Sequence, residues 1–266
     1  MEGRGLRLSA GRQSRRSLLG LLVGAAASVL TSPWAQAFGQ QGAFHPRVLV
    51  AGGRRPSGVR TSAFGRWSWE LVRRTSAPAR LTPEGVAADS PELLAEPFAV
   101  WAGDASVPSL SSAEVRGLAM FLRLGGMLIV DDADPKRGAF GRSVRAELKR
   151  VLPESPIVRL DPGHVIYKSF YIIDRPVGRV EGVPYLEAIV RGKSAQVVLS
   201  SHDLLGALAR RKDGNWALQV EPGGFNQREH AVRLAVNLAM YLLCSDYKDD
   251  QVHARWLMRR RAGRHR

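Results

Sequence analysis

Residues 97–134, PFAVWAGDASVPSLSSAEVRGLAMFLRLGGMLIVDDAD, contain two apolar runs separated by a segment with helical spacing. The runs at 98–101 and 127–130 are continuously apolar, which is typical of strands buried on both faces of a parallel sheet. Ser111-Ser112-Ala113-Glu114 is a capping box that predicts the start of a helix, and Gly125-Gly126 predicts its end. This strand, helix and strand indicate an α/β fold.

The same alternation extends on both sides of this unit. Apolar residues 47–51 stop at Gly52-Gly53, as a central strand entering a tight turn does, and residues 62–74 follow with helical spacing. We therefore expect a mostly parallel sheet with helices on both faces. The remaining expected elements are a short strand at 79–82, a helix at 140–152, an aromatic, β-rich segment at 164–173, strands at 186–190 and 196–200, and a long helix at 226–244.

The first 37 residues have the order of an export signal. A basic region containing Arg15-Arg16 in SRRSLL is followed by an apolar run at 18–30 and by Ala35-Gln36-Ala37. The paired arginines favour a cleavable twin-arginine signal at 1–37, and an ordinary secretory signal is the alternative. The apolar run of 13 residues is shorter than the roughly 20 that a spanning helix needs. We expect export to the periplasm or cell envelope.

Charge is concentrated at the end of the chain. The net charge is +15, and the last twelve residues, RWLMRRRAGRHR, contain six arginines and no acid. We expect one α/β domain at 44–245 and a basic tail at 246–266, which either contacts an anionic membrane surface or is a solvated terminus. Nucleic-acid binding is not expected, because no recognition motif accompanies the charge. Cys244 is the only cysteine, so an intrachain disulfide is excluded, and its apolar neighbours predict a buried, inert thiol.

Polar residues follow several predicted strands. Because the carboxyl ends of parallel strands meet at one edge of a sheet, ligands bind there. The first strand is followed by Gly52, Gly53 and Arg54, and Asp134 lies just beyond the strand at 127–130. We expect one crevice at this edge, and its candidate ligand-binding residues are Gly103, Asp104, Asp131, Asp132, His202 and Asp203.

The chemistry of this crevice has several interpretations. A nucleophile elbow needs Ser or Cys between glycines, and the turn Ala102-Gly103-Asp104 offers neither. We therefore favour a noncatalytic module that binds a small ligand or an envelope protein. The alternative is a hydrolase that uses Asp104, Asp132, His202 and Asp203, with the trio Asp131, Asp132 and Asp134 available to a metal ion. Turn-forming roles are the third interpretation, and the sequence identifies no cofactor.

The segment HVIYKSFYIIDRP (164–176) has two interpretations. His164, Tyr167, Tyr171 and Arg175 alternate with apolar residues and could present a polar, aromatic face to a ligand. Aromatic residues with this spacing are more often part of a core.

Six ordered segments resemble one known family. They are WSWELVRRTS (67–76), PFAVWAGD (97–104), LRLGGMLIVDDAD (122–134), HVIYKSFYIIDRPVGRVEG (164–182), SHDLLGAL (201–208) and the region from PGGFNQREHAVRLAVNLAMYLLC to DYKDDQVH (222–253). Together they resemble the domain-of-unknown-function family 4159 of bacterial envelope proteins. The resemblance implies a flavodoxin-like, class I glutamine-amidotransferase-like three-layer sandwich without an established activity. The amidotransferase cysteine is missing at Ala102-Gly103-Asp104, and His202 replaces an Asn found in many relatives.

Overall fold

The computed structural model describes residues 43–192 and 194–262, with side chains described as far as Cys244. The predicted signal at 1–37 lies outside these residues.

The centre of the fold is a seven-stranded sheet with the order β2-β1-β3-β4-β7-β6-β5. The first five strands in this order run parallel to one another, and β6 and β5 extend the sheet in antiparallel pairs. The predicted mostly parallel sheet is therefore confirmed. The strands are β1 Arg47–Val50, β2 Gly85–Ala87, β3 Phe98–Gly103, β4 Met127–Asp132, β5 Ile157–Arg159, β6 Glu187–Arg191 and β7 Ser194–Ser200.

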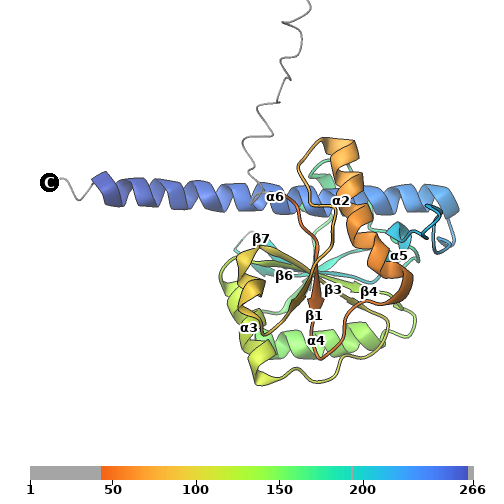
Figure 1. Ribbon diagram of the computed structural model, residues 1–266, viewed down its shortest axis with the longest axis horizontal. Helices are drawn as coiled ribbons and strands as arrows, with labels where there is room; N and C mark the ends of the chain where they lie inside the picture. The colour runs from red at the N-terminus through yellow and green to blue at the C-terminus, as the bar shows by residue number, and fades with distance from the viewer. Residues whose placement is uncertain (1–42, 193, 263–266) are drawn as a thin grey trace, which may run out of the picture. The chain divides into compact units, whose positions relative to one another are not determined.

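Helices cover both faces of this sheet (Figure 1). One face carries α2 (Ser62–Thr75), α5 (Leu204–Leu208) and α6 (Gly224–Ala262), and the other carries α3 (Ser112–Arg123) and α4 (Ala139–Val151). Short 3-10 helices occupy three connections: η2 Gly58–Thr61, η3 Pro91–Ala95 and η4 Val165–Lys168. None of the described helices combines the length and the apolar character needed to cross a membrane.

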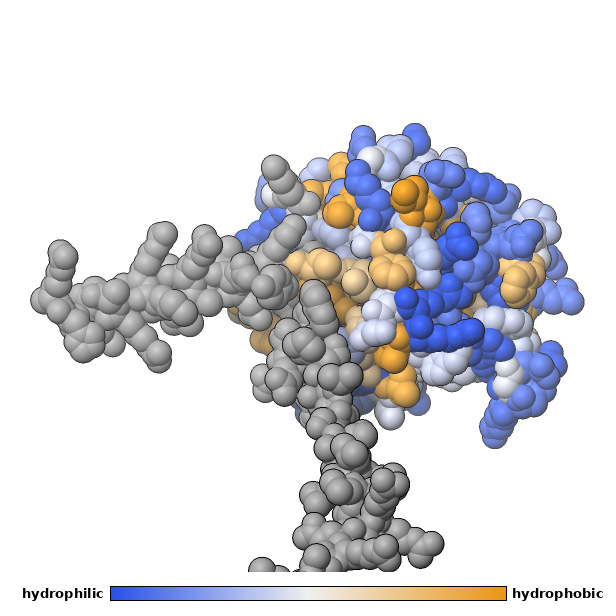
Figure 2. Space-filling model, turned by 90° about the horizontal axis from the view of Figure 1, so that it is seen from above, coloured by the Kyte–Doolittle hydropathy of each residue, from blue (hydrophilic) through white to orange (hydrophobic). Residues whose placement is uncertain are grey.

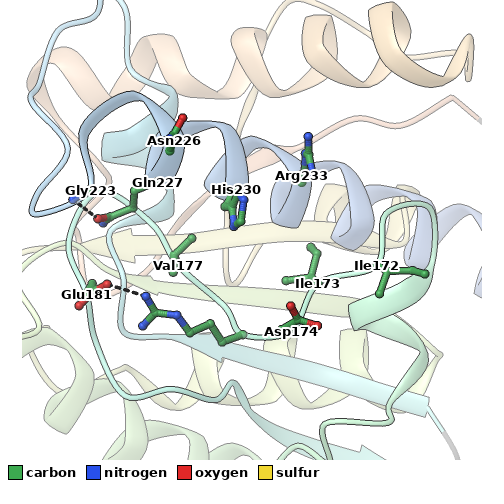
Figure 3. A pocket seen from close by; sticks show the side chains of 11 residues that line it. Ile172, Ile173, Asp174, Val177, Glu181, Gly223, Asn226, Gln227, His230 and Arg233 are labelled. Atoms are coloured by element: carbon green, nitrogen blue, oxygen red, sulfur yellow. Dashed lines mark hydrogen bonds and ion pairs between the residues drawn. The ribbon is translucent and has the colours of Figure 1, made fainter.

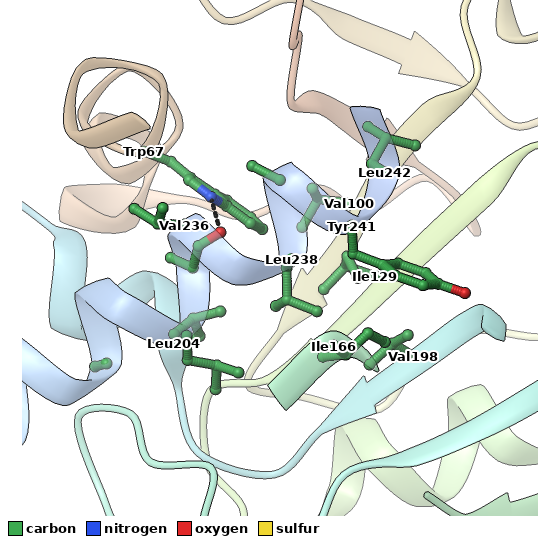
Figure 4. Close-up of a cluster of buried hydrophobic side chains, with 14 of the residues drawn as sticks. Trp67, Val100, Ile129, Ile166, Val198, Leu204, Val236, Leu238, Tyr241 and Leu242 are labelled. Atoms are coloured by element: carbon green, nitrogen blue, oxygen red, sulfur yellow. Dashed lines mark hydrogen bonds between the residues drawn. The ribbon is translucent and has the colours of Figure 1, made fainter. Parts of the chain in front are cut away.

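Each face of the sheet has its own apolar core. On the α2 and α6 face, the indole Nε1 of Trp67 donates a 2.7 Å hydrogen bond to the Ala235 carbonyl, which joins the two helices (Figure 4). On the other face Trp101 and Phe140 make an edge-to-face contact with ring centroids 6.2 Å apart. The exposed apolar side chains visible in Figure 2 form separate patches among hydrophilic residues. Burial of both sheet faces explains why β3 and β4 are continuously apolar.

The predicted capping box of α3 is present. The Ser111 hydroxyl accepts from the Glu114 amide, and the Glu114 carboxylate accepts from the Ser111 amide. The strand predicted at 79–82 is wrong, because Ala79 makes only an isolated bridge to Phe44 and β2 begins later.

The last helix also differs from its prediction. Helix α6 continues to Ala262, so residues 246–262 of the predicted tail prolong this helix, and residues 263–266 lie outside the described part. Cys244 is exposed, so the prediction of a buried thiol is wrong.

The predicted β-rich segment at 164–173 is instead η4 followed by a loop that Asn237 holds in place. The Asn237 side chain is fully buried in α6. Its Oδ1 accepts from the amides of Phe170 and Tyr171, and its Nδ2 donates to the carbonyls of Ile166 and Tyr171. One buried amide side chain therefore binds four backbone groups of this loop.

We expect Asn237→Leu to lower the free energy of unfolding by at least about 3 kcal/mol, because each buried group left unpaired costs about 1–3 kcal/mol. Urea denaturation measures the change. Asn226→Leu is the matched control on the exposed side of the same helix and should change stability by no more than about 0.5 kcal/mol. Equal stability of the two variants would contradict this account of Asn237.

Candidate functional site

Asp131 and Asp132 occupy the end of β4 and point in opposite directions. The Asp131 carboxylate accepts from the amides of Leu204 and Leu205 at the start of α5, at 2.9 and 2.8 Å. The Asp132 carboxylate accepts from the amides of Asp134 and Gly141 near the start of α4, at 3.0 and 3.2 Å. Helix N-termini attract negative charge, so each aspartate stabilises a helix on its own face of the sheet. The two carboxylates do not open into a shared crevice.

Asp203 lies at the start of α5 and is fully buried. Its carboxylate oxygens accept from Nε and Nη2 of Arg60 at 2.8 and 2.7 Å, from Nε of Arg179, and from the Gly206 amide. The Asp203 backbone has a φ of 51°, in the left-handed region, and its amide donates to the Asp132 carbonyl. Asp203 therefore joins three segments that are distant in sequence, and its oxygens are already occupied.

His202 is also buried, and it is neutral at pH 7. Burial lowers the pKa of His202 to about 4. Its Nε2 donates to the Val183 carbonyl at 2.9 Å, and its Nδ1 faces the buried Ser200 hydroxyl at 3.5 Å. Burial, followed by the charge of Asp203, raises the pKa of Asp131 to about 7. Both unusual pKa values arise in the interior and not in an open site.

The loop at 174–183 closes the sheet edge beyond β7. A Cβ atom on Gly178 would lie 2.2 Å from the His202 carbonyl oxygen, and one on Gly182 would lie 2.0 Å from that of Ser201. Only glycine lets the loop backbone approach so closely. The prediction that His202 and Asp203 line a crevice is therefore wrong, because the chain itself fills that space.

Gly103 and Asp104 line a real crevice of about 280 Å³. It lies between the turn that leaves β1 and the turn that leaves β3. Strand β2 lies on one side of β1 and β3 on the other, so the two connections diverge and leave a space between them. The lining residues are Gly53, Arg54, Arg55, Ser57, Trp101, Ala102, Gly103, Asp104, Ala105, Val107 and Phe140.

Polar side chains surround this crevice, and buried rings form its apolar part. The side chains of Arg54, Arg55, Ser57 and Asp104 are exposed and make no hydrogen bond or ion pair with other described residues. The rings of Trp101 and Phe140 are almost fully buried beneath them.

The turn after β1 is held by contacts with α3 and with the segment after β3. The Gly52 amide donates to Glu114 of α3 at 2.6 Å, and a Cβ atom on Gly52 would lie 2.9 Å from Val107. Sequence reasoning missed Arg55, Ser57 and Phe140. The available signal was the glycine pair followed by two arginines.

A second cavity, of about 430 Å³, lies between the first turns of α6 and the loop after η4 (Figure 3). Arg175 pairs with Glu181 at 2.8 Å, and the Gln227 side chain accepts from the Gly223 amide. Only Arg175 of the predicted polar, aromatic face reaches this cavity. His164 caps the start of η4, the Tyr167 hydroxyl accepts from the Leu186 amide, and Tyr171 packs beside Arg74 and Arg233.

Comparison with known protein families matches residues 59–243 to a domain of unknown function, DUF4159. The chain belongs to the DUF4159 family. A search of curated proteins found no match. Within this DUF4159 chain, the match includes Asp104, Asp131, Asp132, His202 and Asp203 and begins after Arg54 and Arg55.

The trio Asp131, Asp132 and Asp134 does not form the metal-ligand set considered from the sequence. Asp131 and Asp132 face opposite sides of the sheet and bind backbone amides, and Asp134 pairs with Arg137 at 3.6 Å. Among the described side chains of this DUF4159 domain, no three His, Cys, Asp or Glu residues are grouped as metal ligands.

The pKa of His202 predicts a pH-dependent stability. The folded state resists protonation until about pH 4, whereas the unfolded histidine takes up a proton near pH 6.5. This contribution is present above pH 6.5 and is lost as the pH falls towards 4, to a total of about 3 kcal/mol. We expect His202→Gln to flatten the loss in this window, as measured by urea denaturation at several pH values. His230→Gln, on the exposed side of α6, should keep the wild-type profile, and parallel profiles for all three proteins would contradict the assignment.

Proposed function

We propose that this DUF4159 domain is a noncatalytic binding module of the bacterial cell envelope and that the crevice between β1 and β3 is its recognition site. One observation carries the proposal. The crevice lies at the point where the strand order reverses, and its polar side chains make no hydrogen bond or ion pair with the described residues. Polar groups held without partners at a preformed opening are available to a ligand.

The second cavity supports a binding function less well. Several of its polar groups are already satisfied within the protein, since Arg175 pairs with Glu181 and Arg233 pairs with Glu229. A ligand there would have to compete with these contacts. In the crevice, a ligand would meet side chains that are exposed and uncommitted.

The lining of the crevice favours binding over nucleophilic catalysis. Among the described residues that line it, Ser57 is the one hydroxyl-bearing side chain, and none is His or Cys. A serine nucleophile needs a base within hydrogen-bond reach. The competing hydrolase needs Asp104, Asp132, His202 and Asp203 around one pocket. It is less well supported because only Asp104 lines the crevice.

We also assign the sheet to the flavodoxin-like, class I glutamine-amidotransferase-like class. Its five parallel strands follow the order β2-β1-β3-β4-β7, which has the flavodoxin-like arrangement 2-1-3-4-5 when the parallel strands are numbered along the chain. Strands β6 and β5 form an antiparallel addition to this arrangement.

The crevice is tested with Ala105→Trp, which places a large ring at its exposed lining. Ala95→Trp introduces the same ring at an exposed site before β3, at the opposite end of that strand. We expect the wild-type protein and Ala95→Trp to retain an envelope component and Ala105→Trp to lose it. Native mass spectrometry after incubation with envelope extract, together with pull-downs from envelope fractions, measures retention. Equal retention by all three proteins would place recognition elsewhere, and no retention by any would contradict a binding module.

The envelope location rests on the proposed twin-arginine signal. We expect Arg15→Lys with Arg16→Lys to leave the chain unprocessed in the cytoplasm, because the pathway reads the arginine pair and not the charge alone. Arg4→Lys with Arg7→Lys conserves charge in the same region and should still be exported. Cell fractionation and immunoblotting measure the outcome. Export of both double variants would instead indicate an ordinary secretory signal.

A further inference from the structure

We propose that the crevice binds the oxyanion of a small ligand, a phosphate or a carboxylate, through Arg54 and Arg55. This inference rests on the proposed function and names the ligand chemistry of the same site. Arg54 and Arg55 follow directly from the turn of β1, whereas Asp104 belongs to the turn of β3.

The charges that line the crevice favour an anionic ligand. Two guanidinium groups and one carboxylate line it, which leaves an excess of one positive charge among the lining side chains. Neither arginine forms an ion pair with Asp104 or with any other described residue. Nearby Arg60 differs, because Asp203 binds it through two hydrogen bonds. Arg54 and Arg55 therefore keep their donors for an external acceptor, and a guanidinium matches the geometry of phosphate and carboxylate.

The size and the lining of the crevice suit a small ligand. Its volume of about 280 Å³ corresponds to about nine water molecules at the density of the liquid. This space fits a phosphate or carboxylate group with a few further atoms. Trp101 and Phe140 are lining residues that are almost fully buried, so protein covers the crevice on their side, and a lower dielectric there would strengthen the attraction between an anion and the two arginines.

The turn that precedes the two arginines is held in place by its neighbours. Gly52 and Gly53 have φ values of 59° and 67°, a backbone conformation that glycine adopts without strain. Glu114 binds the Gly52 amide, and Val107 and Pro108 pack against the same residue. The arginine backbone is thus held in position before the ligand arrives. Asp104 favours a ligand whose oxyanion is accompanied by a hydroxyl or an ammonium group.

Amide NMR titration of the full mature chain with inorganic phosphate at constant ionic strength tests the proposal. We expect saturable shifts at the amides of Gly53 and Gly103, and sodium acetate should act at the same residues. Arg54→Ala with Arg55→Ala should weaken phosphate binding at least tenfold. Arg116→Ala with Arg123→Ala removes the same charge from exposed positions on α3 and should change the affinity less than twofold.

Vesicles that contain phosphatidylglycerol distinguish the two sources of the oxyanion. Crevice-dependent cosedimentation would assign it to a lipid headgroup, and phosphate binding without cosedimentation would assign it to a soluble ligand; both results support the proposal. It is overturned if phosphate shifts no crevice amide, or if the two double variants lose affinity equally. Loss of envelope capture by Ala105→Trp combined with no phosphate binding would keep the binding module and reject only its oxyanion ligand.

Discussion

Three buried carboxylates at the ends of β4 and β7 determine how the carboxyl edge of this sheet is arranged. Asp131 and Asp132 bind the first turns of helices on opposite faces, and Asp203 binds two arginines from distant segments. A carboxylate without partners in the interior would be costly, so these contacts are required once the side chains are buried. They fix α5, α4 and the segment around Arg179 relative to the sheet.

This arrangement divides the carboxyl edge into a closed half and an open half. Beyond β7, the loop at 174–183 lies directly on Ser201 and His202, and glycines permit that contact. Beyond β1 and β3, the strand order sends the two connections apart and leaves a crevice between them, which no described segment fills. The buried carboxylates lie in the closed half, and the open half has exposed polar side chains, which is why we propose the open half as the binding site.

The strands and the helix cap were predictable because their signals are local in the sequence. The position of the loop over His202 and Asp203 was not, because it depends on tertiary contacts. The apolar runs of β3 and β4 and the capping box at Ser111 each depend on neighbours in sequence, so they were predictable. Of the residues that the strand-end rule selected, Gly103 and Asp104 line the crevice, and their predicted role in binding a ligand stays a prediction. The rule was wrong for His202 and Asp203, because a loop some 20 residues earlier covers them. The loop itself depends on Asn237, whose four contacts have no local signature.

The family match covers the buried carboxylates but only part of the crevice lining. The matched residues begin at 59 and contain all three buried carboxylates, so membership in DUF4159 is consistent with the scaffold. Arg54 and Arg55 precede the match, whereas Asp104 lies within it. One wall of the crevice thus comes from the shared domain and the other from the strand and turn before it. The proposed oxyanion binding consequently depends on Arg54 and Arg55, which lie outside the residues that match the family.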